Sequence, residues 1–119
     1  MKTAEWGKFK FAQQKVARSV LTPDQYFTLL DMCESASKYG NILYGTAQVF
    51  ASEYGRSRSH VSTALKTMDE YNIVHKSSSK KNMYIINPSL FYTGSEESED
   101  RAVMMFVSSY KTILIEKRV

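Results

Sequence analysis

The chain has 119 residues, of which 43% are hydrophobic and 24% are charged, and its formal net charge is +4. These are ordinary values for one globular domain, and a chain of this length can fold without disulfides or a metal. The single cysteine, Cys33, excludes an internal disulfide framework and fits a reducing compartment. Because neither a signal peptide nor a membrane-spanning apolar run is visible, we expect a cytoplasmic protein without membrane contact.

Positive charge gathers in two stretches of the chain. Residues 1–21 hold five basic residues and one acidic residue, and residues 56–92 hold six basic residues and two acidic ones. The stretch between them and the last part of the chain are net acidic. Binding to a polyanion requires such clustering, although a solvated basic surface has the same pattern.

Residues 1–21 are predicted to form an N-terminal basic arm or strand. Apolar and basic side chains alternate between Trp6 and Phe11, which is the period of a half-buried strand, and Gly7 is a candidate bulge. Packing of this segment on the core is the favoured interpretation. The alternative is a basic arm that reaches along a nucleic acid.

A core helix is predicted to begin at Thr22 and to end near Tyr39-Gly40. Thr22 can cap its first turn, Pro23 has no N–H to leave unpaired there, and Asp24 meets the positive end of the helix dipole. Apolar residues recur at helical spacing and include Cys33, so we expect an inert buried thiol. Residues 41–45 then predict a short strand that pairs with the hairpin described below.

The next segment predicts two helices joined by a tight turn. Thr46 caps a short helix over residues 47–53, residues 54–56 form the turn around Gly55, and the second helix runs from about Ser57 to Tyr71. The first helix has two expected core anchors, Val49 and Phe50.

The second helix has two faces of opposite character. Apolar residues at steps of three and four form one face: Val61, Ala64, Leu65, Met68 and Tyr71. The other face and the N-terminal end carry hydroxyl and charged groups: Arg56, Ser57, Arg58, Ser59, Ser62, Thr63, Lys66 and Glu70. Small hydroxyl residues beside cations suit a helix that enters the major groove of DNA. His60 lies between the faces and either contacts a phosphate or packs beside the turn.

A hairpin is predicted after this helix. Residues 72–76 and 82–87 form its strands, and a tip of serines and lysines over residues 77–81 joins them. Lys76, Lys80 and Lys81 are candidate contacts to a phosphate backbone, although a soluble hairpin loop can have the same composition. Residues 22–94 therefore predict a winged helix-turn-helix, in an α+β fold that is mainly α.

Three segments resemble the RepL-type plasmid replication proteins, and more widely the MarR- and Crp-like winged-helix regulators. They are Arg56 to Leu65, Asn72 to Val74, and Met83 to Phe91 with Gly94 shortly after. The resemblance covers Leu21 to Gly94, and the Tyr-Ile-Ile-Asn-Pro-Ser-Leu-Phe run is its most specific part. It implies binding to a plasmid or phage origin, or to its control region, and recruitment of host replication proteins.

Residues 95–119 are predicted as a C-terminal helix and a possible dimerisation element. An acidic linker over residues 93–100 precedes a densely apolar helix from Arg101 to about Lys117. Such a helix must bury its apolar stripe, either on its own domain or against a second subunit. Because it follows a complete winged-helix unit, the homodimer is the favoured interpretation.

No catalytic or metal-binding pattern is legible in the sequence. His60 and His75 lack cysteine or carboxylate partners at ligand spacing, and no phosphate-cradling glycine loop is present. We therefore expect no enzyme activity, no metal and no cofactor. The predicted function is sequence-specific binding of double-stranded DNA in plasmid or phage replication. The alternatives are a transcriptional repressor and a winged helix used only for protein contacts.

Overall fold

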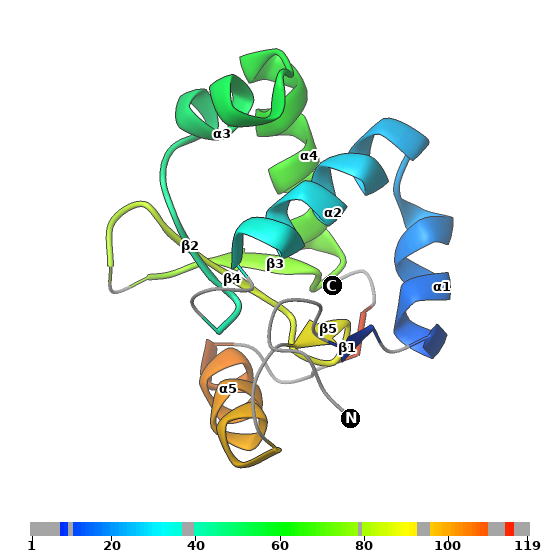
Figure 1. Cartoon of the computed structure of the whole chain (residues 1–119), viewed down its shortest axis with the longest axis vertical. Coiled ribbons are helices and arrows are strands. Elements are labelled where there is room, and N and C mark those ends of the chain that lie inside the picture. The colour runs from blue at the N-terminus through cyan, green and yellow to red at the C-terminus, as the bar shows by residue number, and fades with distance from the viewer. Residues whose placement is uncertain are drawn as a thin grey trace.

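The computed structural model describes residues 8–9, 11–36, 40–78, 80–92, 96–109 and 114–115. The elements in chain order are β1 (Lys8–Phe9), α1 (Phe11–Val20), α2 (Pro23–Ala36), β2 (Ile42–Tyr44), α3 (Ala47–Tyr54), α4 (Arg58–Glu70), β3 (Val74–Lys76), β4 (Met83–Ile86), β5 (Phe91–Tyr92) and α5 (Glu96–Ser109). Figure 1 shows α2, α3 and α4 on one side of a small sheet and α5 on the other. This is the predicted winged helix-turn-helix, an α+β fold that is mainly α.

The central sheet is antiparallel and has the strand order β2-β4-β3. Leu43 pairs with Tyr84 across β2 and β4, and Lys76 pairs with the other side of Tyr84 across β3 and β4. The prediction that a short strand before the helix-turn-helix pairs with the hairpin is therefore confirmed. A second, two-stranded sheet joins β1 to β5 near the N-terminal end of the described chain.

The main core fills the space between the sheet and helices α2, α3 and α4. Its large, fully buried side chains include Leu29 and Met32 from α2, Phe50 from α3, Val61 and Met68 from α4, and Ile73, Ile86 and Leu90. Val49 was expected to join them but is 45% exposed, whereas Phe50 is 1% exposed. The buried side of α3 is formed by Phe50 and Ala51, and because each residue rotates the side chain by about 100°, Val49 lies at the edge of that side and faces solvent.

The N-terminal segment forms the predicted strand at Lys8–Phe9 but differs from the prediction after it, because residues 11–20 form helix α1. The alternation of apolar and basic residues ends at Phe11, and the following residues bury Gln14, Ala17 and Leu21 at helical spacing. Gln13 Nε2 donates a hydrogen bond of 2.7 Å to Ser89 Oγ, which ties α1 to the rest of the domain. Residues 1–7 and 10, where the rest of the predicted arm falls, lie outside the described residues.

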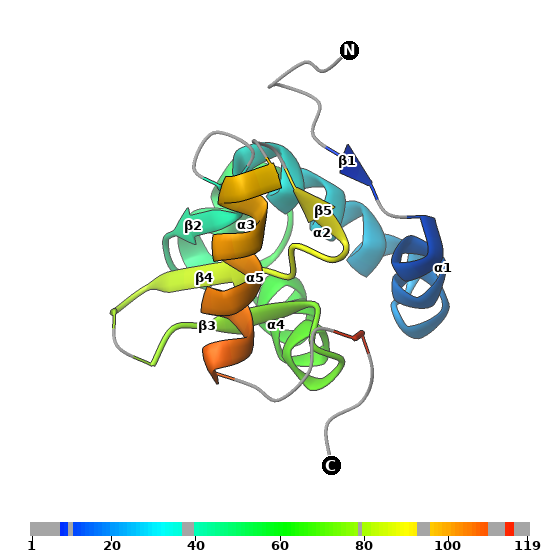
Figure 2. The same ribbon diagram turned by 90° about the horizontal axis from the view of Figure 1, so that it is seen from below.

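Helix α5 begins at Glu96, five residues before the predicted start at Arg101. The acidic residues that were assigned to a linker form its first turn, where negative charge is favourable to the helix dipole. Figure 2 shows α5 lying across the sheet. There Phe106, which is 1% exposed, packs with Met83, Ile85 and Ile42. Ala102 and Phe106 of α5 are thus buried on its own domain.

Candidate nucleic-acid interface

The start of helix α4 is set by capping groups that the sequence predicted. Thr46 Oγ1 accepts a hydrogen bond from Val49 N at the start of α3, and Ser57 Oγ accepts one from His60 N at the start of α4. Between them Gly55 has φ +67°, a left-handed conformation that favours glycine. These local signals fix the angle at which α4 leaves the turn.

Helix α4 presents the two faces expected from its sequence. Val61, Ala64 and Met68 are fully buried in the core. The hydroxyl and charged residues opposite them are all exposed to solvent: Ser59, Ser62, Thr63, Lys66 and Glu70, with Ser57 and Arg58 at the N-terminal end. The protein's own residues therefore leave this surface open.

The exposed side of α4 meets the hairpin at a shallow hollow. Its volume is about 300 Å³, and it lies between α4 and strands β3 and β4. Lys66 and Lys76 line it together with Asp69 and Tyr84. Two cations from different elements thus flank one concave surface, an arrangement that suits a phosphate group.

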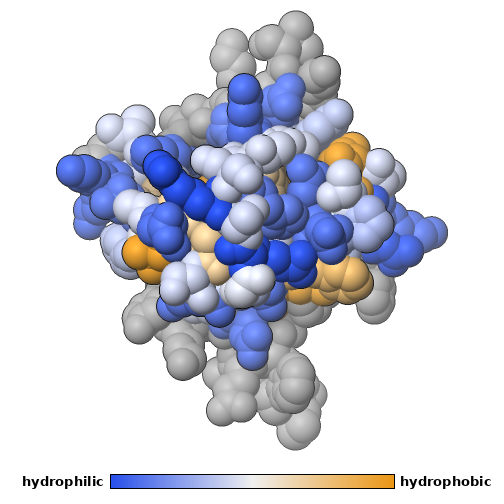
Figure 3. All heavy atoms as spheres, turned by 90° about the horizontal axis from the view of Figure 1, so that it is seen from above, coloured by the Kyte–Doolittle hydropathy of each residue, from blue (hydrophilic) through white to orange (hydrophobic). Residues whose placement is uncertain are grey.

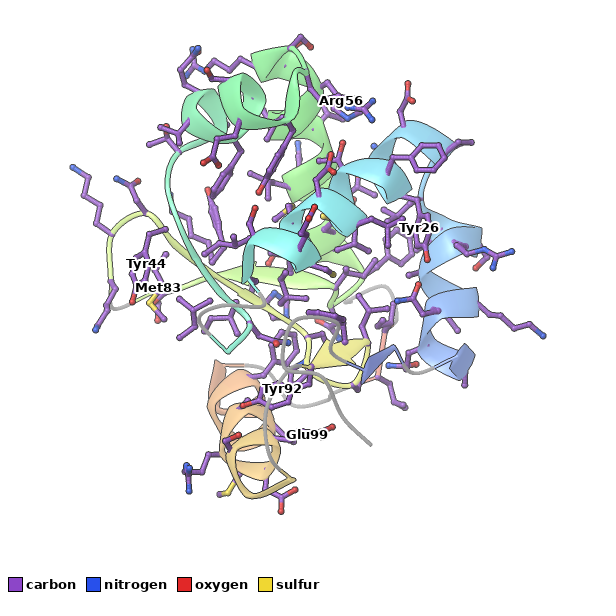
Figure 4. All side chains as sticks on the ribbon, viewed as in Figure 1. Tyr26, Tyr44, Arg56, Met83, Tyr92 and Glu99 are labelled. Atoms are coloured by element: carbon purple, nitrogen blue, oxygen red, sulfur yellow. The ribbon has the colours of Figure 1, made fainter. Side chains whose placement is uncertain are left out.

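Arg56 and His60 are held by helix α2. Arg56 Nη1 lies 3.3 Å from Asp24 Oδ1, and Figure 4 shows the arginine at the side of the turn. Thr28 Oγ1 donates its hydroxyl proton to Asp24 O over 2.9 Å and lies 2.8 Å from His60 Nε2. Since that hydroxyl has one proton, it accepts a hydrogen bond from His60 Nε2–H. His60 therefore packs against α2, and contact of its ring with a phosphate stays a prediction.

The hairpin places its lysines at the end of the wing. Ser77 N donates to Met83 O over 2.8 Å, and Ser77 Oγ accepts a hydrogen bond from Lys80 N over 3.1 Å. Asn82 has φ +56° and returns the chain into β4. Lys80 and Lys81 are exposed beyond the strands. Figure 3, seen from the end where α3 and α4 lie in Figure 1, shows a mainly hydrophilic surface.

A family model for the Firmicute plasmid replication protein (RepL) matches residues 26–113, which is most of the chain. The chain belongs to the RepL family. No curated protein and no solved structure matches it. Membership gives the chain a role related to plasmid replication.

The RepL match extends farther than the resemblance seen in the sequence. It begins three residues after the start of α2 and continues through α5. The C-terminal helix was expected to lie outside the shared region, yet it falls inside. Since α5 covers one face of the sheet, it forms part of the RepL domain rather than an appendage.

The most specific part of the RepL resemblance has a structural role that sequence reasoning missed. Asn87, at 0% exposure, donates from Nδ2 to Asn72 O over 2.8 Å, and its Oδ1 accepts from Ser89 N over 2.8 Å. Asn41 Nδ2 donates to Ile86 O and Phe91 O. Asn87 thus joins the corner after the wing to the turn after α4, and Asn41 joins β4 and β5 to the turn after α2. From the sequence, residue 87 was predicted only as the last residue of the second hairpin strand.

A second feature missed from the sequence lies behind the wing. His75 is 2% exposed, its Nδ1 lies 2.7 Å from Asp69 Oδ1, and its ring stacks on Phe106 at 4.6 Å. This contact links α4, β3 and α5. A period-two strand pattern gives no signal for it, because the partner helix is remote in sequence.

The described residues offer little for other chemistry. Within the described ranges, no three histidine, cysteine or carboxylate side chains converge as a metal ion requires. Burial raises the pKa of the Cys33 thiol, so the reactive thiolate is disfavoured. None of the helices that the structure describes combines the length and apolar character needed to cross a bilayer.

Proposed function

We propose that this RepL-family chain binds double-stranded DNA and initiates or controls replication of the plasmid that carries its target site. The observation that supports this proposal is the open hydroxyl-and-cation surface of α4. Helix α4 would lie in the major groove with Arg58, Ser59, Ser62, Thr63 and Lys66 toward the bases and phosphates. Lys76, Lys80 and Lys81 would contact the sugar–phosphate backbone from the wing.

Arg56, Ser57 and His60 would support this surface from its edge. Ser57 Oγ accepts from His60 N, and the first-turn N–H groups that this cap leaves unused would be directed at an adjacent phosphate. Arg56 and His60 would orient α4 through their contacts with α2. The proposed activity is binding without catalysis, and recruitment of host replication proteins would follow on the bound origin.

The same surface could serve a transcriptional repressor, but RepL membership favours replication. The two functions separate on the location of the preferred site, at an iterated origin or at the promoter of the chain's own gene. A winged helix used only for protein contacts is a third function, and the cationic face of α4 argues against it.

Homodimerisation through α5 also stays a proposal. The buried side of α5 is already occupied by the sheet, so a dimer would use the outward side, where Met104 is 70% exposed. Two copies related by a two-fold axis would read two half-sites of one duplex.

Selection of bound fragments from random duplex DNA, followed by salt titration, tests the proposal. We expect one enriched sequence whose affinity falls steeply with salt, at a slope of about −0.9 per neutralised phosphate. The control variant is Arg101→Gln, which removes an exposed charge from α5 on the other side of the sheet and should leave the slope unchanged. Absence of an enriched sequence, together with a salt-independent residual affinity, would contradict DNA binding.

A further inference from the structure

Strand β2 leaves one edge of the central sheet open. It pairs only with β4 among the described strands, and β3 takes the opposite edge of β4. Gly45 N donates to Asn82 O, and Ile86 N donates to Asn41 O. Along an edge strand of an antiparallel sheet, the main-chain N–H and C=O groups of every second residue bond the neighbouring strand. Those of the residues between them point away from it. The main-chain N–H and C=O groups of Ile42 and Tyr44 therefore point outward, where a further strand could bond them.

A groove runs along this open edge. Its volume is about 530 Å³, and it lies between β2 and helices α2 and α3. Phe50 and Leu43 contribute apolar surface, and Tyr44 is 59% exposed at its outer end. Figure 4 shows Tyr44 beside Met83, its partner across the sheet. An exposed aromatic ring beside unpaired main-chain groups suits an extended peptide.

The wall opposite the strand is acidic. Glu34 and Glu53 line the groove. The same two residues, together with Asp31, also line an adjoining hollow of about 400 Å³. Neither hollow has a lysine or arginine among its described lining residues. Tyr54 Oη donates to Ser35 Oγ over 3.1 Å, which joins α2 to α3 beneath these carboxylates. The described lining of this wall thus carries three carboxylates on two helices that are already joined.

We propose that this groove, defined by β2, Glu34 and Glu53, binds an extended lysine- or arginine-bearing segment of a partner protein as an added strand. Main-chain hydrogen bonds to Ile42 and Tyr44 would supply the pairing, and the carboxylates would select basic side chains. DNA phosphates are repelled by the same carboxylates. A second copy pairing through its own β2 would bring two acidic walls together, which is unfavourable for the same reason.

This inference does not depend on DNA binding. Among the described residues, none from α4 or the wing tip lines either hollow. The groove and the α4 surface can therefore be occupied together, so that one molecule would hold a protein segment while bound to a duplex.

Peptide selection on the full chain tests the proposal, with a library of random displayed peptides as the probe. We expect enrichment of peptides that alternate basic and apolar residues. On binding of an enriched peptide, the amide protons of Ile42 and Tyr44 should exchange more slowly with solvent. Failure to enrich basic peptides, or slowed exchange confined to α4, would overturn the proposal.

A matched pair of variants tests the added strand itself. Tyr44→Pro removes an outward N–H but no bond to β4, since proline is tolerated on edge strands. Tyr44→Ala removes the ring and keeps the N–H. We expect Tyr44→Pro to weaken the peptide about tenfold more than Tyr44→Ala does. Equal affinities of the two variants would exclude strand addition.

Charge variants keep the test decisive if Tyr44→Pro fails to fold. Glu34→Gln with Glu53→Gln should weaken the peptide and flatten its salt dependence. Asp100→Asn on α5 removes an exposed carboxylate elsewhere and should change neither. An affinity that is unchanged by the glutamate variants would overturn the role of the acidic wall.

Discussion

Arg58 and Lys66 differ from Arg56 and His60 in what already holds their side chains. Arg56 pairs with Asp24, and His60 bonds Thr28, whereas Arg58 and Lys66 are exposed on α4. A cation that is already paired within the protein has less to gain from a new partner. The exposed pair should therefore carry more of the sequence reading.

We predict that Arg58→Ala and Lys66→Ala each lower the affinity for the selected duplex by about 1–3 kcal/mol if the side chain reads a base. Arg56→Ala should cost less, because its guanidinium is engaged by α2. Fluorescence anisotropy on one labelled duplex measures all three, with circular dichroism as the check on folding. Unchanged affinity in both exposed variants would place the reading surface elsewhere.

Cys33 gives a prediction for pH. Burial raises the pKa of this thiol above its unfolded value of about 8.5, so the folded state keeps a proton that the unfolded state loses. The contribution of Cys33 to stability is complete below that unfolded value and is lost progressively as the pH rises from it towards the raised pKa of the folded state. The loss approaches about 1.4 kcal/mol per pH unit for one proton.

Urea unfolding between pH 7 and pH 9.5 measures this loss, because the tyrosines titrate higher. The Cys33→Ala variant is the control and should lack that part of the slope, although its small cavity lowers stability at every pH. Parallel pH profiles for the two proteins would show that the thiol does not contribute.

The roles of some single residues could be predicted from the sequence, and the roles of others could not. The capping roles of Thr46 and Ser57 could be predicted, because a cap depends on groups three residues away. The roles of Asn41, Asn72 and Asn87 could not, since their carbonyl partners lie far along the chain. Asn72 Nδ2, for example, donates to Leu114 O over 3.2 Å.

At the scale of elements, the helix-turn-helix and the wing were predictable and α1 was not. In residues 46–87, apolar residues recur with the period of 3.6 that is typical of helices and the period of 2 that is typical of strands. The positions of Gly55 and of the polar hairpin tip indicate the same element boundaries. In the N-terminal segment, the alternating pattern of residues 6–11 is typical of a strand. No capping or turn residue in the sequence separates this pattern from the residues that form α1. The start of a helix can be predicted from the sequence only where a capping or turn residue marks it.

The wing gives the prediction that belongs to an element. Replacing Lys80 and Lys81 by alanine should weaken all duplexes about equally, because backbone contacts carry no sequence information. The slope of log affinity against log salt should flatten by about one for each lost phosphate contact. Titration of one specific and one unrelated duplex measures both effects, and Ser78→Ala is the uncharged control at the same tip. A loss confined to the specific duplex would show that the tip reads bases.

For the whole molecule, substitutions on the two sides of α5 should have different effects, one on stability and the other on dimerisation. Phe106→Ala should lower the free energy of unfolding by about 3–5 kcal/mol, because it empties the contact with the sheet. Met104→Asp should leave stability nearly unchanged and should dissociate a dimer that uses the outward side. Sedimentation and urea unfolding separate the two effects. A wild-type chain that is monomeric at micromolar concentration would contradict the homodimer.

The charge of the whole molecule is divided between its surfaces. Cations gather on α4 and the wing, whereas Asp31, Glu34 and Glu53 gather beside β2. The sequence predicted the first group, because its members are close along the chain. The second group could be recognised only after α2 and α3 were packed together, since no local pattern links Glu34 to Glu53.

The position of α5 beneath the sheet also limits how far this protein can be shortened. A chain truncated directly after the wing would expose Met83 and Ile85 to water on the side of the sheet that Phe106 covers in the full chain. Such a fragment would tend to aggregate through this exposed apolar surface. The smallest useful piece of this domain must therefore reach past Phe106.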